Sequence, residues 1–202
     1  MKKFTVGFFI AALILSAAFN FGVVQGENIS GSVLRLHIPA NSNSLMDQEI
    51  KLKIRDKVIK KYSAFLKDLH KREDAESVIR ENLDEIEKDV NLWLEQEEAG
   101  YKATVELSYS DFPLKDYGEI KLPAGTYKAL KIVLGSGRGE NWWCIMFPPL
   151  CFVEGSVKKL DEKEYELLKK ELGKTAFELV TKEGKSVFLK FKIVELVNNI
   201  IG

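Results

Sequence analysis

The chain has 202 residues, of which 46% are hydrophobic and 30% are charged, so it holds enough apolar material for the core of one domain. Basic and acidic residues number 30 each, and this zero net charge argues against a nucleic-acid partner. The composition also excludes a disordered chain, which would carry fewer hydrophobic residues and a larger net charge. We therefore expect one folded domain that binds no nucleic acid.

The N-terminus has the pattern of an export signal. A short basic segment, Met1 to Lys3, precedes an apolar run from Phe4 to Ala18. That run closes on Ser16-Ala17-Ala18, which puts small residues at the two positions that a signal peptidase reads. Apolar character resumes from Phe21 to Val24, so the whole stretch approaches the ~20 residues that cross a bilayer. Cleavage of the signal and its retention as a membrane anchor therefore both stay open.

The domain boundaries follow from this signal. Residues 1–26 are assigned to the signal peptide or signal anchor, and residues 27–202 to an extracytoplasmic domain. No second hydrophobic run of spanning length follows in the sequence. We expect the protein to act outside the membrane across which it is exported.

The exported part is predicted to begin with a strand and two long amphipathic helices. Residues 32–38 alternate as in a half-buried strand, which Pro39 ends. One face of this strand carries Leu34, Leu36 and Ile38, and the other carries Val33, Arg35 and His37. After the turn, Ser44 and Asp47 resemble a capping arrangement for a helix that runs to about Leu69. The second helix is indicated by hydrophobic residues at steps of three or four, namely Ile79, Leu83, Ile86, Val90 and Trp93.

After Gly100, where the second helix is expected to stop, the period changes from helical to alternating. Strands are predicted at 101–109, 120–122 and 127–134. Prolines and glycines separate these strands, which is typical of turns. We interpret the three strands as an antiparallel meander.

The C-terminal part is predicted to be helical. A short amphipathic helix spans Asp161 to Leu172 and ends at Gly173. The last apolar stretch, Val187 to Ile201, favours a helix, although Phe188 to Ile193 also fits a strand. The predicted fold class is α+β, a single domain with an N-terminal strand, two long amphipathic helices, an antiparallel meander and C-terminal helices.

The segment ENWWCIMFPPLCF, residues 140–152, contains the only two cysteines of the chain. In an exported protein, Cys144 and Cys151 are expected to form a disulfide, because the two prolines between them bend the chain. A second hypothesis makes Cys144 a nucleophile with His37 or His70 as its base. The paired cysteines and the absence of a local histidine signature argue against it. Two cysteines and two scattered histidines match no zinc pattern, and we expect neither a metal nor a cofactor.

Two further features of this region have alternative interpretations. Trp142 and Trp143 are adjacent, so on an extended segment they point to opposite sides, one toward the core and one toward solvent. An exposed tryptophan beside a rigid loop is typical of an interaction anchor. The glycine-rich residues 135–139 follow a strand as a phosphate cradle would, but no helix and no Lys-Ser/Thr pair follows them. A flexible connecting loop is the favoured interpretation.

Hydrogen-bonding side chains are dense where the first strand leads into the first helix. They are Arg35, His37, Asn41, Ser42, Asp47, Gln48, Lys51, Arg55 and Asp56. Asp47 and Lys51 lie one helical turn apart, as do Lys51 and Arg55. This group is either a binding face or an internal polar network that fixes the junction, and spacing alone does not decide between them.

Two stretches of the chain resemble a known family. RLHIPANSNSLMDQEIKLKIRD, residues 35–56, and ENWWCIMFPPLCF are similar in order and separation to motifs of the stage II sporulation protein R family. The matched positions are His37, Ala40, Asn41, Ser42, Ser44, Asp47, Gln48, Asn141 to Cys144 and Phe147 to Cys151. Pro39 departs from the pattern, in which an aliphatic residue is expected. No motif of the family is apparent in the second helix or in residues 154–185.

The resemblance implies an activity that composition does not show. It implies a non-enzymatic protein that is secreted across the forespore membrane of an endospore-forming bacterium into the intermembrane space. There it would activate a membrane-embedded aspartic protease, the sigma-E factor processing peptidase, which cleaves pro-sigma-E in the mother cell. The implied partner is that protease, with no small-molecule substrate.

The partner-binding residues are our own hypothesis, since the resemblance supplies none. We assign them from the two motifs as Trp142, Trp143, Asn141, Arg35, His37, Asn41, Ser42, Asp47, Gln48, Lys51 and Arg55. Two other classes stay open at this point, an extracytoplasmic cysteine-dependent hydrolase and a cell-wall-binding module. A hydrolase would need only one of its two cysteines, whereas a structural disulfide needs both.

Overall fold

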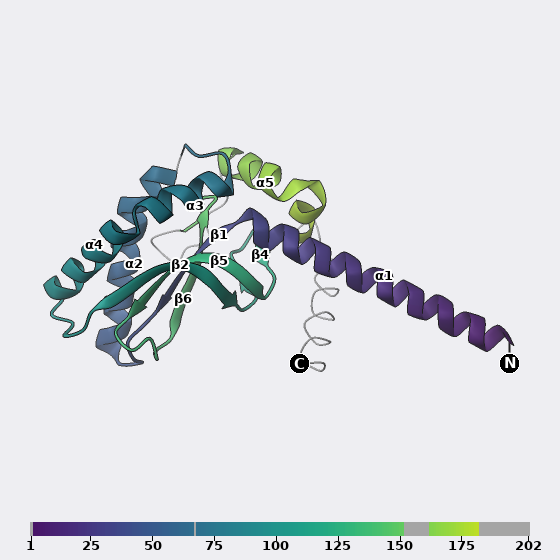
Figure 1. The fold of residues 1–202 in the computed structure, drawn as a ribbon, viewed down its shortest axis with the longest axis horizontal. Coiled ribbons are helices and arrows are strands. Elements are labelled where there is room, and N and C mark those ends of the chain that lie inside the picture. Colours follow the sequence, from purple (N-terminus) through teal and green to yellow (C-terminus); the bar gives the residue numbers. More distant parts are fainter. Residues whose placement is uncertain (1, 67, 152–161, 182–202) are drawn as a thin grey trace.

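A four-stranded sheet with the strand order β2-β5-β1-β6 forms the centre of the protein (Figure 1). The structure is a computed structural model, which describes residues 2–66, 68–151 and 162–181. Its elements are α1 (Lys2–Ser32), β1 (Leu34–Pro39), α2 (Leu45–Leu66), α3 (Arg72–Glu81), α4 (Leu83–Gln96), β2 (Ala103–Phe112), β3 (Lys115–Asp116), β4 (Lys121–Leu122), β5 (Gly125–Leu134), β6 (Asn141–Phe147) and α5 (Glu162–Val180). The predicted α+β class and single domain are confirmed.

The sheet is mixed and is not the expected simple meander. β1 pairs in parallel with β5, with Leu36 opposite Leu130, and antiparallel with β6. β2 pairs directly with β5 over its whole length, while β3 and β4 form a separate two-stranded hairpin. A parallel pair needs a long crossover connection, and helices α2 to α4 lie between β1 and β5 in the chain. Alternation along a strand identifies the strand but not its partner, so the parallel pairing was missed.

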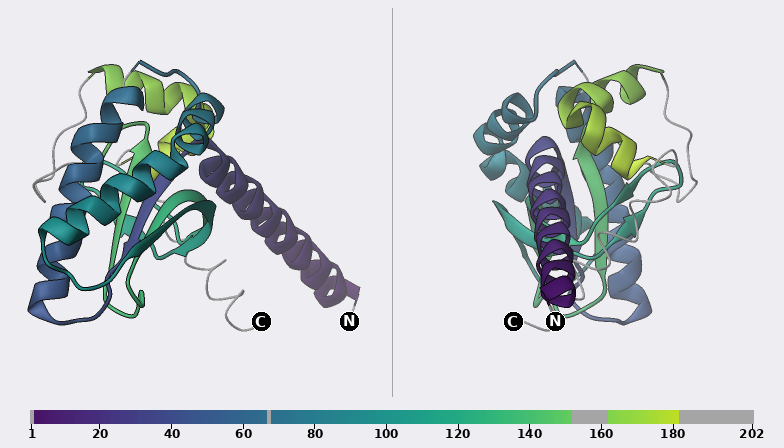
Figure 2. Two further views of the ribbon diagram at one scale, coloured as in Figure 1. Left: turned by 60° about the vertical axis from the view of Figure 1, so that its left-hand side comes forward. Right: turned by 90° about the vertical axis from the view of Figure 1, so that its right-hand side faces the viewer.

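Hydrophobic clusters cover both faces of the sheet, and Figure 2 shows helices on more than one side of it. On one face, α2, α3 and α4 pack on side chains such as Leu36 and Leu130. On the other face, α5, Ile29 of α1 and Leu122 of β4 pack on side chains such as Ile145. All six residues of β1 are therefore buried. The expectations that this strand is half-buried and that His37 lies on an exposed face were wrong, because a central strand of a covered sheet has no free face.

The helices differ from the prediction at their ends. The first ends at Leu66 instead of Leu69, and the second is two helices, α3 and α4. These two meet at Asn82, whose backbone leaves the helical region and whose side-chain amide donates to the carbonyl of Val78. α5 continues beyond the predicted stop. Gly173, at a φ of 71°, kinks the helix there instead of ending it, and the helix resumes and runs to Val180. The predicted Val187–Ile201 helix lies outside the described residues.

α1 projects away from the rest of the molecule in Figure 1, and only its C-terminal end joins the core. The helix runs past the predicted boundary between residues 26 and 27, and Ile29 and the following Val33 are fully buried. Ser32 donates to the carbonyl of Glu171 in α5 at 2.8 Å. Over the described residues, no helix combines the length and the apolar character that a membrane crossing requires. The export signal itself stays a prediction.

Candidate functional site

The sheet brings the two sequence motifs together, although about 100 residues separate them. In the β1–β6 register, His37 lies opposite Trp143, Ile38 opposite Trp142, and Pro39 opposite Asn141. The first half of β6 therefore runs beside the turn that leads from β1 into α2. We call this region the junction site, and its residues are His37, Asn41, Ser42, Asp47, Gln48, Lys51, Arg55, Asn141, Trp142 and Trp143. Arg35, the remaining predicted residue, lies deeper on β1.

Asp47 is the centre of a hydrogen-bond network at the start of α2. Its carboxylate accepts from Asn41 Nδ2 at 3.0 Å, from the Ser42 hydroxyl, and from the Tyr101 hydroxyl at 2.7 Å. The predicted capping arrangement forms in part: the Asp47 N–H donates to Ser44 Oγ at 3.2 Å, while the Asp47 carboxylate turns to the network. Tyr101 was predicted only as a strand residue, and nothing in its spacing indicated this contact. These bonds support the internal-network interpretation for Asn41, Ser42 and Asp47.

The network changes the acidity of Asp47. Burial raises the pKa of the carboxyl, but hydrogen bonds from Ser42, Tyr101 and Asn41 outweigh it, and the pKa lies below its ordinary value of 3.8. A carboxyl with a lowered pKa stabilises the fold fully above its ordinary pKa. That stabilisation is lost as the pH falls through the pKa of the folded state.

We expect Asp47→Asn to lower the free energy of unfolding by about 2 kcal/mol at pH 7, because charge-assisted hydrogen bonds to the carboxylate are lost. Urea unfolding at pH 7, 5 and 3 measures the effect. The difference from the unmodified protein should be equal at pH 7 and 5 and smaller at pH 3. A difference that does not change with pH would contradict the charged state of Asp47 in this network.

Hydrogen bonds join the glycine-rich loop after β5 to the turn between β1 and α2. Asn41 accepts the N–H of Ser136 on Oδ1 at 2.9 Å and the N–H of Arg138 on its backbone carbonyl at 3.3 Å. The N–H of Gly139 goes to the carbonyl of Ala40 at 2.8 Å, and that of Glu140 to Asn43 Oδ1 at 2.7 Å. A phosphate cradle needs such N–H groups to be free. The loop is therefore a connection that positions β6.

At position 139 only glycine lets the loop backbone lie this close to the backbone of Ser42. A Cβ at this position would lie 2.2 Å from the carbonyl oxygen of Ser42 and 2.9 Å from the Cβ of Ala40. We expect Gly139→Ala to lower the free energy of unfolding by roughly 2 kcal/mol, because backbone has to shift. Chemical unfolding measures this, with Gly125→Ala as the control, since neither glycine has a left-handed backbone and the added Cβ of Gly125 would meet only Tyr127 Cε2 at an ordinary 3.6 Å. Equal losses in the two variants would contradict the role of the close contact between Gly139 and Ser42.

Lys51 ties α2 to the start of β6. Its Nζ donates to Gln48 Oε1 at 2.6 Å and to the backbone carbonyl of Glu140 at 3.0 Å, while Gln48 Nε2 donates to the carbonyl of Ser42. Burial lowers the pKa of the Lys51 ammonium. The predicted neighbours Asp47 and Lys51 do not pair with each other. Each instead holds a different part of the junction.

Trp142 and Trp143 point to opposite faces of β6, as the sequence predicts. The Arg55 guanidinium lies over the Trp142 ring at 4.1 Å on the α2 side. On the other side, the His37 ring stacks on Trp143 with 3.9 Å between centroids. Both tryptophans are half-buried, so the expectation that one is buried and the other exposed is wrong. Cationic and aromatic neighbours cover part of each ring.

His37 is held by its neighbours on β6. Its Nε2 lies 3.0 Å from Asn141 Oδ1. Burial lowers the pKa of the imidazole, and the contact with Asn141 opposes this only in part. A neutral His37 stacked on Trp143 is a packing element of the junction site.

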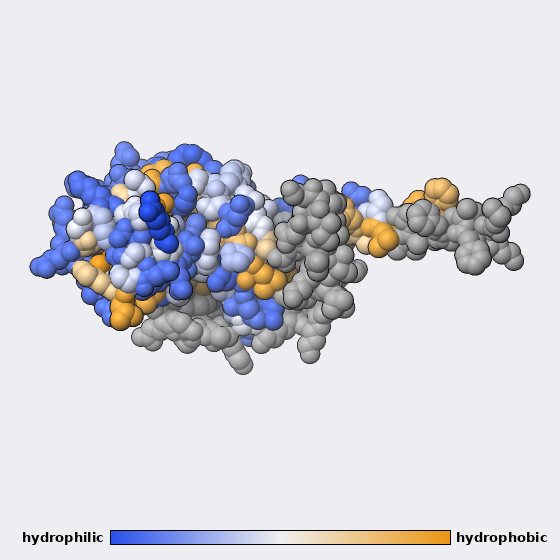
Figure 3. Space-filling model, turned by 90° about the horizontal axis from the view of Figure 1, so that it is seen from below, coloured by the Kyte–Doolittle hydropathy of each residue, from blue (hydrophilic) through white to orange (hydrophobic). Residues whose placement is uncertain are grey.

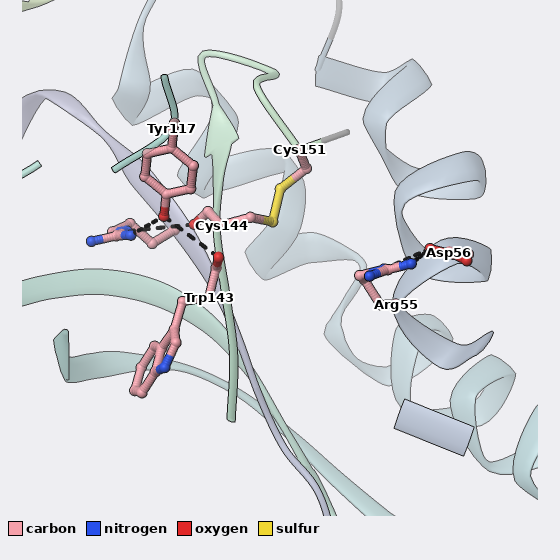
Figure 4. The surroundings of a disulfide bond; sticks show 7 residues. Arg55, Asp56, Tyr117, Trp143, Cys144 and Cys151 are labelled. Carbon is pink, nitrogen blue, oxygen red and sulfur yellow. Dashed lines mark hydrogen bonds and ion pairs between the residues drawn. A yellow bond between two sulfur atoms is a disulfide. The ribbon is translucent and has the colours of Figure 1, made fainter. Parts of the chain in front are cut away.

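The two cysteine sulfur atoms lie 1.97 Å apart, at bonding distance, with 5.5 Å between the Cα atoms. Figure 4 shows Cys144 reaching Cys151 on the side of β6 that faces α2, while Trp143 leaves the strand on the other side. His37 also lies on that other side, stacked on Trp143. The sheet therefore separates Cys144 from His37, and this placement contradicts their pairing as nucleophile and base.

Arg35 is fully buried on the face of the sheet that bears Trp143. Its guanidinium lies 3.9 Å from the Phe112 ring centroid and 4.8 Å from that of Tyr127. It donates to the Tyr117 hydroxyl, and more weakly from Nε to the carbonyl of Cys144 at 3.4 Å. Burial lowers the pKa of this guanidinium. Among the described residues no carboxylate pairs with it and its Nη1 has no hydrogen-bond partner, so aromatic rings and neutral oxygens surround its charge.

A sequence model of the family described as Stage II sporulation protein R matches residues 30–157, which is more than half of the chain. The chain belongs to the stage II sporulation protein R family. It is also 39% identical over 178 residues to the Stage II sporulation protein R of Bacillus subtilis (strain 168), covering 81% of this chain and 79% of the relative. No solved structure matches it.

Membership of the stage II sporulation protein R family confirms the resemblance predicted from residues 35–56 and 140–152. The matched residues 30–157 include β1, α2 and β6, and therefore the whole junction site. They leave out most of α1 and all of α5. Family membership supports a role in sporulation.

Proposed function

We propose that this protein is an exported signal of sporulation that activates the membrane-embedded aspartic protease responsible for cleaving pro-sigma-E in the mother cell. In this proposal it is secreted across the forespore membrane and acts in the intermembrane space as a ligand of the protease, without chemistry of its own. The resemblance stated above motivates the choice of partner.

The observation that carries the proposal is the assembly of the junction site. Two motifs about 100 residues apart meet along the first half of β6, and a polar network, the glycine-rich loop and the Cys144–Cys151 contact hold them in place. Half-buried tryptophans fixed by a rigid scaffold are well suited to docking, because little conformational entropy is lost when they bind. A cysteine nucleophile would instead need a base beside it, and the sheet separates Cys144 from His37, one of the two candidate bases.

The proposal predicts that the tryptophans are needed for activation. Trp142→Ala and Trp143→Ala should each weaken the interaction with the protease by about 2 kcal/mol, or roughly thirtyfold in affinity. The measurement is pro-sigma-E cleavage, by immunoblot, in sporulating Bacillus subtilis that lacks its own stage II sporulation protein R and expresses this chain. Tyr109→Ala is the matched control, because Tyr109 is an exposed aromatic residue on β2, at the opposite edge of the sheet.

The result that would contradict this role is normal pro-sigma-E cleavage by both tryptophan variants at the same protein level as the unmodified chain. Loss of cleavage in the Tyr109 control to the same degree would also contradict it, since the effect would then not be specific to the junction site. Protein levels are compared by immunoblot of the same cells.

A further inference from the structure

The two edges of the sheet differ in whether side chains bond to their outward backbone groups. At the β2 edge, Asn91 of α4 accepts the N–H of Ala103 at 2.8 Å and donates to its carbonyl at 3.2 Å. Glu87 of α4 accepts the N–H of Val105 at 2.9 Å. The start of that edge is therefore capped by side chains, which is a common way to prevent pairing with another chain.

Among the described residues, no side chain caps the β6 edge at its start in this way. The Glu140 carbonyl accepts the N–H of Ala40, so residue 140 turns its backbone toward β1. Because the direction alternates along an antiparallel strand, Trp142 also faces β1, while Asn141 and Trp143 turn their backbone groups outward. Further along, the outward carbonyl of Ile145 is taken by the N–H of Leu150 at 3.1 Å. At Asn141 and Trp143, the described part of the chain supplies only the Tyr117 hydroxyl, 3.5 Å from the Trp143 carbonyl.

The sequence of β6 also lacks the residues that discourage edge pairing. Asn141 to Phe147 contains no proline and no charged residue. The face of the molecule seen in Figure 3 is mostly hydrophilic, with separate hydrophobic areas. An uncharged strand edge with free N–H and C=O groups is a template for one more strand.

We propose that an extended segment of the partner protein adds to β6 as a fifth strand, paired through the outward backbone groups of Asn141 and Trp143. This inference rests on the proposed function, because it takes the protease as the partner. The added strand would place alternate side chains beside Trp142 on one face of the sheet and Trp143 on the other. Specificity then comes from the tryptophans and affinity from main-chain hydrogen bonds.

The charges beside β6 favour a partner segment over a second copy of this chain. Lys51 has only neutral oxygens within hydrogen-bond distance among the described residues, whereas Arg55, which lies over Trp142 on the same face, is already paired with Asp56. A second copy paired through its own β6 would offer Lys51 no acidic side chain, because Asn141 to Phe147 is uncharged. A partner segment with an acidic side chain on the Trp142 face would complement the charge of Lys51.

Residue-resolved amide hydrogen exchange of the full chain, with and without the protease in detergent, tests this pairing. In the free protein the N–H of Trp142 should be protected, because it bonds to β1, while those of Asn141 and Trp143 should exchange fast. On binding, the exchange of the Asn141 and Trp143 amides should slow by roughly tenfold or more, with that of Trp142 unchanged.

If the protein activates the protease and both amides still exchange fast, strand addition is wrong. If it fails to activate the protease at all, the proposed function is wrong instead. Protection of both amides in concentrated free protein would identify a second copy as the occupant and overturn the proposal.

A pair of variants isolates the backbone donor. Asn141→Ala and Asn141→Pro both remove the side-chain contact with His37, but only the proline removes the outward N–H. We expect the proline variant to activate the protease at least roughly tenfold less well than the alanine variant. Equal activation by the two, with equal thermal stability, would overturn the proposal.

Discussion

Replacing Arg35 by alanine is expected to lower the free energy of unfolding by about 4 kcal/mol, as for other large side chains removed from a core. The side chain is fully buried and fills the space between the rings of Phe112 and Tyr127. Truncation would leave a cavity there and would take away the donor to the Tyr117 hydroxyl, which joins the β3–β4 hairpin to the sheet. Chemical unfolding measures the loss.

Two further substitutions separate shape from charge at this position. Arg35→Met keeps most of the volume and removes a buried charge that no described carboxylate offsets, so it should cost clearly less than alanine. Arg35→Lys keeps the charge but loses the planar group that lies against Phe112, and should cost about as much as alanine. An alanine variant within about 1 kcal/mol of the unmodified protein would contradict the structural role of Arg35.

Joint replacement of Cys144 and Cys151 by alanine should lower the free energy of unfolding by about 2–3 kcal/mol, the loop-closure contribution of so short a ring. Cys144 is buried against the core next to α2, so part of the loss also comes from the missing sulfur atom. Unfolding in the presence and absence of a reductant measures the effect. The reductant should destabilise the unmodified protein and leave the double variant unchanged.

The thiol state of the folded protein tests the same bond directly. Mass spectrometry after alkylation without a reductant should show neither cysteine modified. Alkylation of both would contradict the disulfide and would return Cys144 to consideration as a nucleophile.

Local patterns in the sequence predict much of this fold. Alternation locates β1 and β2, helical periodicity locates α2, and the Ser44 cap marks its start. The opposite directions of Trp142 and Trp143 follow from the two-residue period of a strand. Each of these features depends only on residues close together in the chain.

Contacts between distant segments could not be predicted in this way. Arg35 and His37 are buried because aromatic residues and distant segments cover their face of β1, yet alternation alone assigned these two to a free face. Tyr101 reaches Asp47 across 54 residues, and Asn82 breaks a helix that its hydrophobic period would continue. The meeting of residues 35–56 with residues 140–152 is likewise a product of sheet order.

The most direct measurement is cleavage of pro-sigma-E by the protease in vesicles, with the purified full-length protein added on the side that faces the intermembrane space. Cleavage should rise with the concentration of added protein, saturate, and require much more of the Trp142→Ala variant than of the Tyr109→Ala control. No cleavage with the unmodified protein, in vesicles where the protease is shown to be intact, would contradict the account.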